Sequence, residues 1–312
     1  MARFSMATLL GEEQPSPIDQ RLARIEAQLQ ALARRNEEIL AYLAARANRA
    51  ADAASAYLGD NTAVTFLETG QRILVDTRSL DIGVHLLTLG MWEPQYTALF
   101  RRLVRPGDTV LDLGANHGVY TLIAAQLAGP AGRVHAFEPN PRLAHLAEMS
   151  ARLNGYGDTV TMHRVCASDS EGSTWLVFET AFSGGGTQNR TGVEGETALA
   201  CRTAILDEIF ADPGFKVDVV KLDVEGSEGR ALRGMRGLLA RSPDVRILME
   251  FAPAMLAGSG VPAAEVVEML ESLGLSPWTV GEGGALHPAR WADLAAMQDG
   301  LQNILVAREA PP

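Results

Sequence analysis

The feature that most constrains the fold of this chain is a regular alternation of short apolar segments with helical patterns, which begins at Thr109. Alternation of this kind predicts right-handed β–α–β units that build a parallel sheet with helices on both faces. We therefore expect an α/β fold with a mostly parallel sheet of seven strands. The segments expected as strands are 109–113, 133–137, 160–165, 217–222, 246–251, 276–280 and 303–307.

The residues upstream of this alternation predict a short β-structure and a helix. Segments 63–67 and 72–76 alternate in polarity on either side of Thr69-Gly70, which predicts a β-hairpin over 63–76. The alanine-rich start of 47–62 predicts the end of a helix that runs into a linker. Another helix is expected over 94–104, where Pro106-Gly107 ends it.

Near the N-terminus, apolar residues recur at alternating spacings of three and four between Ile18 and Leu43, with a single polar Asn36 in the series. This heptad repeat predicts a coiled-coil helix over 16–57 that self-associates through residues 18–43. A flexible tail over 1–15 would precede it and an α/β domain over 58–312 would follow. An amphipathic helix packed on its own domain is the alternative. Leu at the a positions and the single Asn favour different numbers of strands, so the number of subunits stays open.

Composition excludes several classes of protein. The formal net charge of −11 argues against nucleic acid as the main partner, because phosphates call for clustered Lys and Arg. The two cysteines, Cys166 and Cys201, have the spacing of neither a zinc site nor a disulfide framework. No apolar run approaches the roughly 20 residues that cross a bilayer, and residues 1–10 lack the organisation of a signal peptide. We therefore expect a cytoplasmic protein with no transmembrane segment.

The most informative stretch is V-L-D-L-G-A-N-H-G-V-Y-T at 110–121, in which a buried strand meets a helix. Gly114 would let the backbone turn sharply beside a ligand, and Gly118 would allow close packing of helix on strand. In an open α/β sheet, ligands bind beyond the carboxyl ends of the strands. We therefore expect a cofactor at this loop.

The second strand ends in Glu138, where a carboxylate can accept hydrogen bonds from a ribose diol. Nicotinamide enzymes use the same device, so the first loop has to separate the two classes. A dinucleotide site needs a G-x-G-x-x-G loop to cradle a pyrophosphate. This loop instead offers Asp112, which suits the cationic end of S-adenosylmethionine and would repel a pyrophosphate.

Several linked motifs carry a resemblance to a known family. D-L-G-A-N-H-G-V-Y-T, H-A-F-E-P-N-P and V-D-V-V-K-L-D-V-E-G-S-E resemble the FkbM family of methyltransferases, as do G-M-W-E-P at 90–94, A-S-D at 167–169 and T-A-I-L-D at 203–207. The resemblance covers about residues 80–252. It implies a class I methyltransferase Rossmann-like fold, S-adenosylmethionine as cofactor, and methylation of a hydroxyl on a sugar, glycan or natural product.

The resemblance also implies roles for individual positions. The methionine end of the cofactor would meet the first loop, the ribose would meet the end of the second strand, the adenine would lie after the third strand, and one residue would approach from upstream. His117 departs from the pattern and is interpreted as a bystander, with a role in catalysis as the alternative. The implied cofactor residues are Asp112, Gly114, Ala115 and Asn116, with Gly118, Tyr120 and Thr121 in the turn into the helix, then Glu138, Pro139, Asn140, Cys166, Ala167 and Glu93.

Acidic residues end the fourth and fifth strands, where a general base is expected. Asp223 or Glu225 is predicted to be the base or to orient the acceptor, with Glu250 nearby and Lys221 keeping the carboxylates ionised. Crowded carboxylates also suit a divalent cation, and the residues leave metal dependence open. The alternative for Glu225 and Glu228 is that they only cap the following helix.

Two further points stay open. Residues 179–198 have the composition of a mobile loop that would close on the acceptor, and an exposed hairpin tip is the alternative. For the whole chain, a hydroxyl-directed methyltransferase competes with a nicotinamide-dependent oxidoreductase and with a non-catalytic oligomeric scaffold that keeps a vestigial pocket.

Overall fold

The computed structural model describes residues 25, 28, 55–179, 181–188, 196–297 and 300–309. The chain divides into two units, residues 1–54 and 55–312. Apart from Ile25 and Gln28, the predicted tail over 1–15 and the heptad seam over 18–43 lie outside the described residues. Self-association through this segment therefore stays a prediction.

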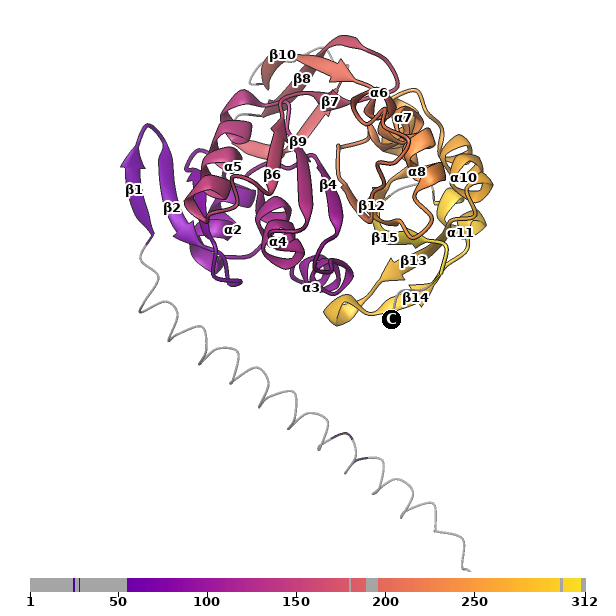
Figure 1. The fold of residues 1–312 in the computed structure, drawn as a ribbon, viewed down its shortest axis with the longest axis horizontal. Helices are drawn as coiled ribbons and strands as arrows, with labels where there is room; N and C mark the ends of the chain where they lie inside the picture. The colour runs from indigo at the N-terminus through magenta and orange to yellow at the C-terminus, as the bar shows by residue number, and fades with distance from the viewer. Residues whose placement is uncertain are drawn as a thin grey trace, which may run out of the picture. The chain divides into compact units, whose positions relative to one another are not determined.

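The centre of the second unit is a sheet of eight strands in the order β14-β13-β15-β12-β11-β4-β5-β6 (Figure 1). Strands β12, β11, β4, β5 and β6 are parallel, whereas β15 runs antiparallel to both β12 and β13. All seven expected strands are present, and β14 adds an edge strand. The bounds are β4 Thr109–Leu113, β5 Arg133–Phe137, β6 Val160–His163, β11 Val219–Leu222, β12 Arg246–Phe251, β13 Ser276–Val280, β14 Leu286–Pro288 and β15 Gln302–Ala307.

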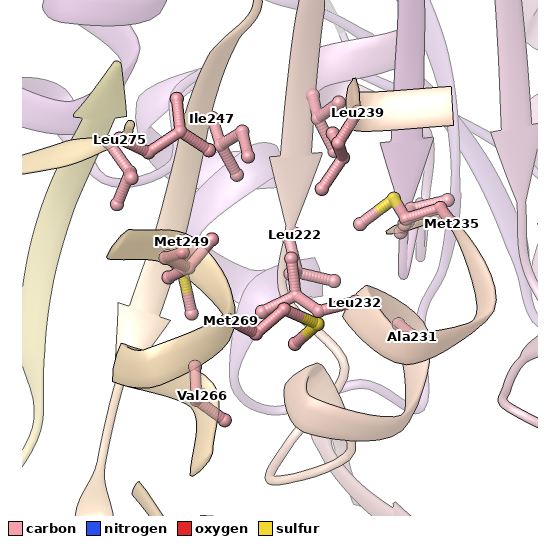
Figure 2. Packing of buried hydrophobic residues seen from close by; sticks show 14 of the residues in the cluster. Leu222, Ala231, Leu232, Met235, Leu239, Ile247, Met249, Val266, Met269 and Leu275 are labelled. Carbon is pink, nitrogen blue, oxygen red and sulfur yellow. The ribbon is translucent and has the colours of Figure 1, made fainter. Parts of the chain in front are cut away.

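Successive residues of each strand point to opposite sides of this sheet, and both sides carry apolar side chains. Helices therefore cover both faces. One core packs the side of Val110 and Leu248 against α3 and α4, and the other packs the side of Leu222 and Met249 against α7, α8 and α10. Figure 2 shows this second core. The helices are α2 Ile82–Leu89, α3 Pro94–Leu103, α4 Val119–Ala128, α5 Pro141–Leu153, α6 Leu206–Ile209, α7 Glu228–Gly234, α8 Arg236–Arg241, α9 Pro253–Gly258, α10 Ala263–Ser272 and α11 Trp291–Ala295, with the 3₁₀ turn η1 Glu282–Gly284.

A three-stranded antiparallel sheet precedes the central one and consists of β1 Ala56–Gly59, β2 Thr62–Phe66 and β3 Arg72–Asp76. Strands β2 and β3 form the expected hairpin. Residues 56–59 were expected in the run-out of a helix into a linker, and this was wrong. They pair with β2 because Asp60 and Asn61 both adopt positive φ, the conformation of a tight two-residue hairpin turn.

A third sheet has the order β7-β10-β8-β9. Residues 182–188 and 196–198 are strands where a mobile loop over 179–198 was expected, whereas residues 180 and 189–195 of that span lie outside the described residues. Two hydrogen bonds join the third sheet to the start of α2. The amide of Leu80 donates to the carbonyl of Ala181 at 2.7 Å, and the amide of Gly184 donates to a carboxylate oxygen of Asp81 at 2.7 Å. The strands are β7 Cys166–Ala167, β8 Gly172–Glu179, β9 Phe182–Gln188 and β10 Glu196–Ala204.

Within the described ranges, no helix combines the length and the apolar character that crossing a membrane requires.

Candidate active site

A cavity of about 980 Å³, measured to its open mouth, lies beyond the carboxyl ends of β4, β5, β11 and β12. Its position follows from the strand order. Strand β4 pairs with β5 on one side and with β11 on the other, so the chain leaves β4 and β11 in different directions. A crevice opens where the strand order reverses in this way, and ligands bind there.

The loop after β4 has a strained backbone that is fixed by its neighbours. Gly114 and Gly118 adopt φ of +83° and +88°, and Asn116 between them adopts +49°. A β-carbon on Gly118 would lie 2.9 Å from that of Ala147, so this glycine permits close packing against α5 rather than against a strand. A non-glycine residue at positive φ stores strain that the surrounding structure must hold in place.

Asp112 lies behind this loop, outside the cavity wall. It is buried, it does not line the cavity, and its Oδ2 accepts a hydrogen bond from the hydroxyl of Thr121 at 2.5 Å. Burial raises the pKa of Asp112 to about 6, against the lowering effect of the Thr121 hydrogen bond. The geometry therefore places this carboxyl group where it ties β4 to α4.

Glu138 lines the cavity and is held by two backbone amides. One carboxyl oxygen accepts from the amide of Asn116 and the other from the amide of Asn140, both at 2.8 Å. Burial raises the pKa of Glu138 to about 7, although both amide hydrogen bonds favour the ionised form. Each oxygen keeps lone-pair capacity for a hydroxyl donor, which fits the ribose diol of a nucleoside.

His117 has a structural role that the sequence alone did not indicate. Its Nδ1 lies 2.6 Å from Oδ1 of Asn116, and its Nε2 accepts the backbone amide of Asp76 at 3.2 Å. Burial lowers the pKa of His117 to about 4, so the ring is neutral and Nδ1 carries the proton. This histidine joins the cofactor loop to β3.

Nine of the thirteen predicted cofactor residues line the cavity, and four do not. The other four lie behind the residues that line the cavity. Asp112 and Thr121 are hydrogen-bonded to each other, Gly118 packs against α5, and Asn140 caps the N-terminus of α5. The nine that line it are Glu93, Gly114, Ala115, Asn116, Tyr120, Glu138, Pro139, Cys166 and Ala167.

Lys221 lies beneath the predicted catalytic acids in an aromatic cage. It is 1% exposed, and its Nζ donates to Oδ2 of Asp223 at 2.8 Å. The same nitrogen lies 5.1 Å from the ring centre of Tyr96 and 4.8 Å from that of Tyr120. The hydroxyl of Tyr120 in turn donates to Glu93 at 2.8 Å. A buried ammonium group needs such partners to stay charged.

Asp223, Glu225 and Glu250 all line the cavity, but the protonation of the two glutamates differs from the prediction. Lys221 makes its ion pair with Asp223. Burial, followed by repulsion from Asp223, raises the pKa of Glu225 to about 8 and that of Glu250 to about 9. The expectation that Lys221 keeps the carboxylates ionised was therefore wrong for these two, because burial and mutual repulsion outweigh its attraction.

Glu225 is held in place by Glu228. Glu225 adopts φ of +50°, and Oε1 of Glu228 accepts the amides of Val224 and Gly226 at 3.1 and 3.2 Å. Glu228 therefore holds the loop on both sides of Glu225, and its part in the site is structural. Glu225 itself points to the cavity rather than capping α7.

The part of the chain that the structure describes contains no group of three His, Cys, Asp or Glu side chains arranged to hold a metal ion. The crowded acids thus give no support to the divalent cation that the sequence left open.

Sequence reasoning missed the apolar part of the cavity wall. Four of its residues, Trp92, Val119, Phe137 and Val224, lie inside the motifs that carry the family resemblance, although no role was assigned to them. The local sequence does not mark the remaining four, which are Ile82, Val165, Leu176 and Gly184.

Comparison with known proteins agrees with this geometry. A family profile described as "Methyltransferase FkbM domain" matches residues 112–275, more than half of the chain. The 31-O-demethyl-FK506 methyltransferase FkbM of Streptomyces tacrolimicus is 30% identical over 242 residues, which cover 60% of this chain and 89% of that protein. The ribosomal protein L11 methyltransferase of Bacillus cytotoxicus is 40% identical over 73 residues, 22% of this chain and 23% of that protein.

Two solved structures show a distant similarity to this chain. The fibrillarin of Aeropyrum pernix, solved with S-adenosyl-L-methionine, has a TM-score of 0.39 and 15% identity, and the match covers 82% of this chain and 99% of that one. The O-methyltransferase TomG of Streptomyces achromogenes has a TM-score of 0.37 and 16% identity, with coverage of 68% and 76%. On the family match and the long alignment with the Streptomyces enzyme, this chain belongs to the FkbM family of S-adenosylmethionine-dependent methyltransferases.

Proposed function

We propose that this methyltransferase methylates a hydroxyl oxygen of a neutral, hydroxyl-rich acceptor such as a sugar, a glycan or a natural product, with Asp223 as the general base. The observation that carries the proposal is the ion pair of Asp223 with the caged Lys221 at the cavity wall. The printed name of the Streptomyces relative, which designates an O-demethyl compound as its substrate, supports oxygen as the target atom.

The cavity suits the cofactor of the family. Phe137, Val165, Ala167 and Leu176 offer an apolar wall for an adenine ring, and Glu138 offers acceptors for the ribose. When bound, S-adenosylmethionine supplies a methyl group on a positively charged sulfur. The carboxylate of Asp223 at the cavity wall favours that charge.

Asp223 is the acid best suited to take the acceptor proton. Its side chain is 23% exposed, while that of its partner Lys221 is 2% exposed, so the carboxylate reaches the cavity and its charge is compensated from within the protein. A positioned base of this kind contributes about a hundredfold or more to the rate. Alignment of the acceptor with the methyl group contributes about 7–11 kcal/mol at most.

Glu225 and Glu250 favour a neutral acceptor with several hydroxyl groups. Because their pKa values of about 8 and 9 keep them protonated at neutral pH, both can donate and accept hydrogen bonds. An anionic acceptor would be repelled by the carboxylate of Asp223. Neutral hydroxyl groups meet no such repulsion and can exchange hydrogen bonds with the two protonated acids.

The proposal is tested by incubating the full chain with methyl-labelled S-adenosylmethionine and a panel of neutral sugars, glycans and hydroxylated macrocycles. We expect label in a methyl ether, located by NMR, and binding of S-adenosylhomocysteine that Glu138→Ala weakens. Label on nitrogen or carbon would overturn the choice of oxygen. Binding of NAD in place of S-adenosylhomocysteine would revive the oxidoreductase alternative, and binding of neither would favour the scaffold.

A further inference from the structure

Asn303 lies on β15 directly opposite Glu250 on β12. Opposing residues of an antiparallel pair project from the same face, with their β-carbons about 4.5–5.5 Å apart. Glu250 lines the cavity, so the amide of Asn303 stands beside the acid cluster. Asn303 also lies outside residues 112–275, and the family match therefore assigns it no role.

The amide oxygen of Asn303 is exceptional within the described ranges. It is the one buried side-chain nitrogen or oxygen there that no hydrogen-bond donor reaches. A buried acceptor without a partner destabilises the fold, so such atoms are rare in native proteins. An explanation for this oxygen therefore has to name its donor.

Two donors of the neighbourhood make hydrogen bonds to other acceptors. The hydroxyl of Tyr96 donates to the carbonyl oxygen of Ile304 at 3.4 Å. The ammonium group of Lys221 donates to Asp223 at 2.8 Å. The neutral carboxyl group of Glu250, directly across the strand pair from Asn303, has a proton to give.

The surroundings of Glu250 favour that proton. Burial contributes most to its raised pKa of about 9, and repulsion from neighbouring carboxylates adds to it, against the attraction of one ammonium group. The titratable groups that face Glu250 are Asp223 and Lys221 from the end of β11, Glu225 from the following loop, Glu93 from the start of α3 and Tyr96 from α3 itself.

We propose that Asn303 is a positioning residue for Glu250. The carboxyl O–H of Glu250 donates to Oδ1 of Asn303, which fixes the orientation of the carboxyl group. Its carbonyl oxygen then stays available to accept a hydrogen bond from a second hydroxyl of the acceptor. That last step rests on the proposed function, whereas the Asn303–Glu250 pair does not.

The test is a titration of the glutamate side-chain carboxyl carbons by ¹³C NMR on the full-length protein without ligand. Glu250→Gln identifies the resonance of Glu250. In Asn303→Leu the neutral carboxyl group loses its acceptor, so the pKa of Glu250 is expected to fall by about one unit. An unchanged pKa would overturn the proposal. A raised pKa would also overturn it, since the amide nitrogen would then be donating to the ionised carboxylate.

A second pair of variants keeps the test decisive if Asn303→Leu does not fold. Asn303→Thr and Asn303→Val have nearly the same shape and suit a strand, but only threonine carries an oxygen acceptor. The pKa of Glu250 should be lower in the valine variant than in the threonine variant, and equal values would overturn the pairing.

Addition of S-adenosylmethionine to the same sample separates this proposal from the proposed function. Its positive sulfur should lower the pKa of Glu250. If the cofactor moves the resonances of neither Glu250 nor Glu138, the assignment of the cavity fails, while the Asn303 result stands on its own.

Discussion

The backbone of Gly114 lies directly against that of Asp223. A β-carbon placed on residue 114 would be 1.8 Å from the carbonyl oxygen of Asp223, and the amide of Asp223 donates to the carbonyl of Leu113 at 3.0 Å. The loop expected to hold the cofactor and the strand end expected to hold the base are therefore one rigid junction. The glycine at 114 permits this backbone contact and also lines the cavity.

Gly114→Ala should disrupt both halves of the site. The new methyl group has to displace the backbone of Asp223, and the residue adopts a φ of +83° that alanine disfavours. We expect a drop in the temperature of unfolding and at least a tenfold loss of S-adenosylhomocysteine affinity by calorimetry. Gly107→Ala is the matched control, with a φ of +88° and nothing within 4 Å, and should cost about 1 kcal/mol alone. Equal effects of the two variants would contradict the junction.

Lys221→Met should destabilise the fold more than its partner-matched double variant does. Removal of the buried ammonium group leaves the carboxylate of Asp223 without its counter-charge, which costs about 3 kcal/mol in comparable buried pairs. Lys221→Met combined with Asp223→Asn removes both charges and should recover part of that loss. Chemical denaturation of the wild type, the two single variants and the double variant measures the coupling energy between Lys221 and Asp223. Additive losses of stability would show that the two charges do not stabilise each other.

The sequence predicted the central sheet well because strand periodicity and helix alternation are local properties. It failed for β1 and β9, where tertiary contacts decide the structure. Gly184 belongs to a glycine-rich segment whose composition predicts a loop. Its amide nevertheless donates a hydrogen bond to Asp81, about a hundred residues earlier in the chain.

The candidate site shows the same division between local pattern and tertiary context. Acids at strand ends were visible in the sequence, because strand ends are where α/β sites form. Their protonation was not, because it depends on burial and on groups brought together by folding. The cage that surrounds Lys221, for instance, comes from Tyr96 and Tyr120 on two different helices.

Asp223→Asn and Glu225→Gln should affect methyl transfer unequally at pH 7. Asparagine cannot accept the acceptor proton, so kcat should fall by about a hundredfold or more while S-adenosylhomocysteine binding persists. Glutamine resembles the neutral carboxyl group that Glu225 carries below its pKa of about 8, so its effect should be several-fold at most. A larger loss for Glu225→Gln would move the base from Asp223 to Glu225.

The heptad segment predicts self-association independently of the catalytic unit. Leu29 occupies an a position of the repeat, and a charged residue there would have to be buried in the seam. Leu29→Glu should therefore lower the mass measured by light scattering on the full chain without changing S-adenosylhomocysteine binding. A monomeric wild-type chain would contradict the coiled coil and favour the amphipathic alternative.

Between pH 7 and 9, the protein without cofactor should lose stability as the pH rises. A carboxyl group whose pKa is higher in the folded state than in the unfolded chain keeps its proton when folded, so rising pH favours unfolding until the folded pKa is passed. Glu225 and Glu250, with pKa values of about 8 and 9 against an ordinary 4.5, act in this direction. The lowered pKa of His117, about 4, affects stability only at lower pH, where falling pH destabilises the fold.

Thermal unfolding at intervals across this window measures the slope. Glu225→Gln should flatten it between pH 7 and 8, because glutamine has no proton to lose, and Glu250→Gln should flatten it up to pH 9. Glu271→Gln, at an exposed position on α10, is the control and should leave the slope unchanged. If neither Glu225→Gln nor Glu250→Gln changes the slope, the two glutamates are already ionised in the folded state at neutral pH.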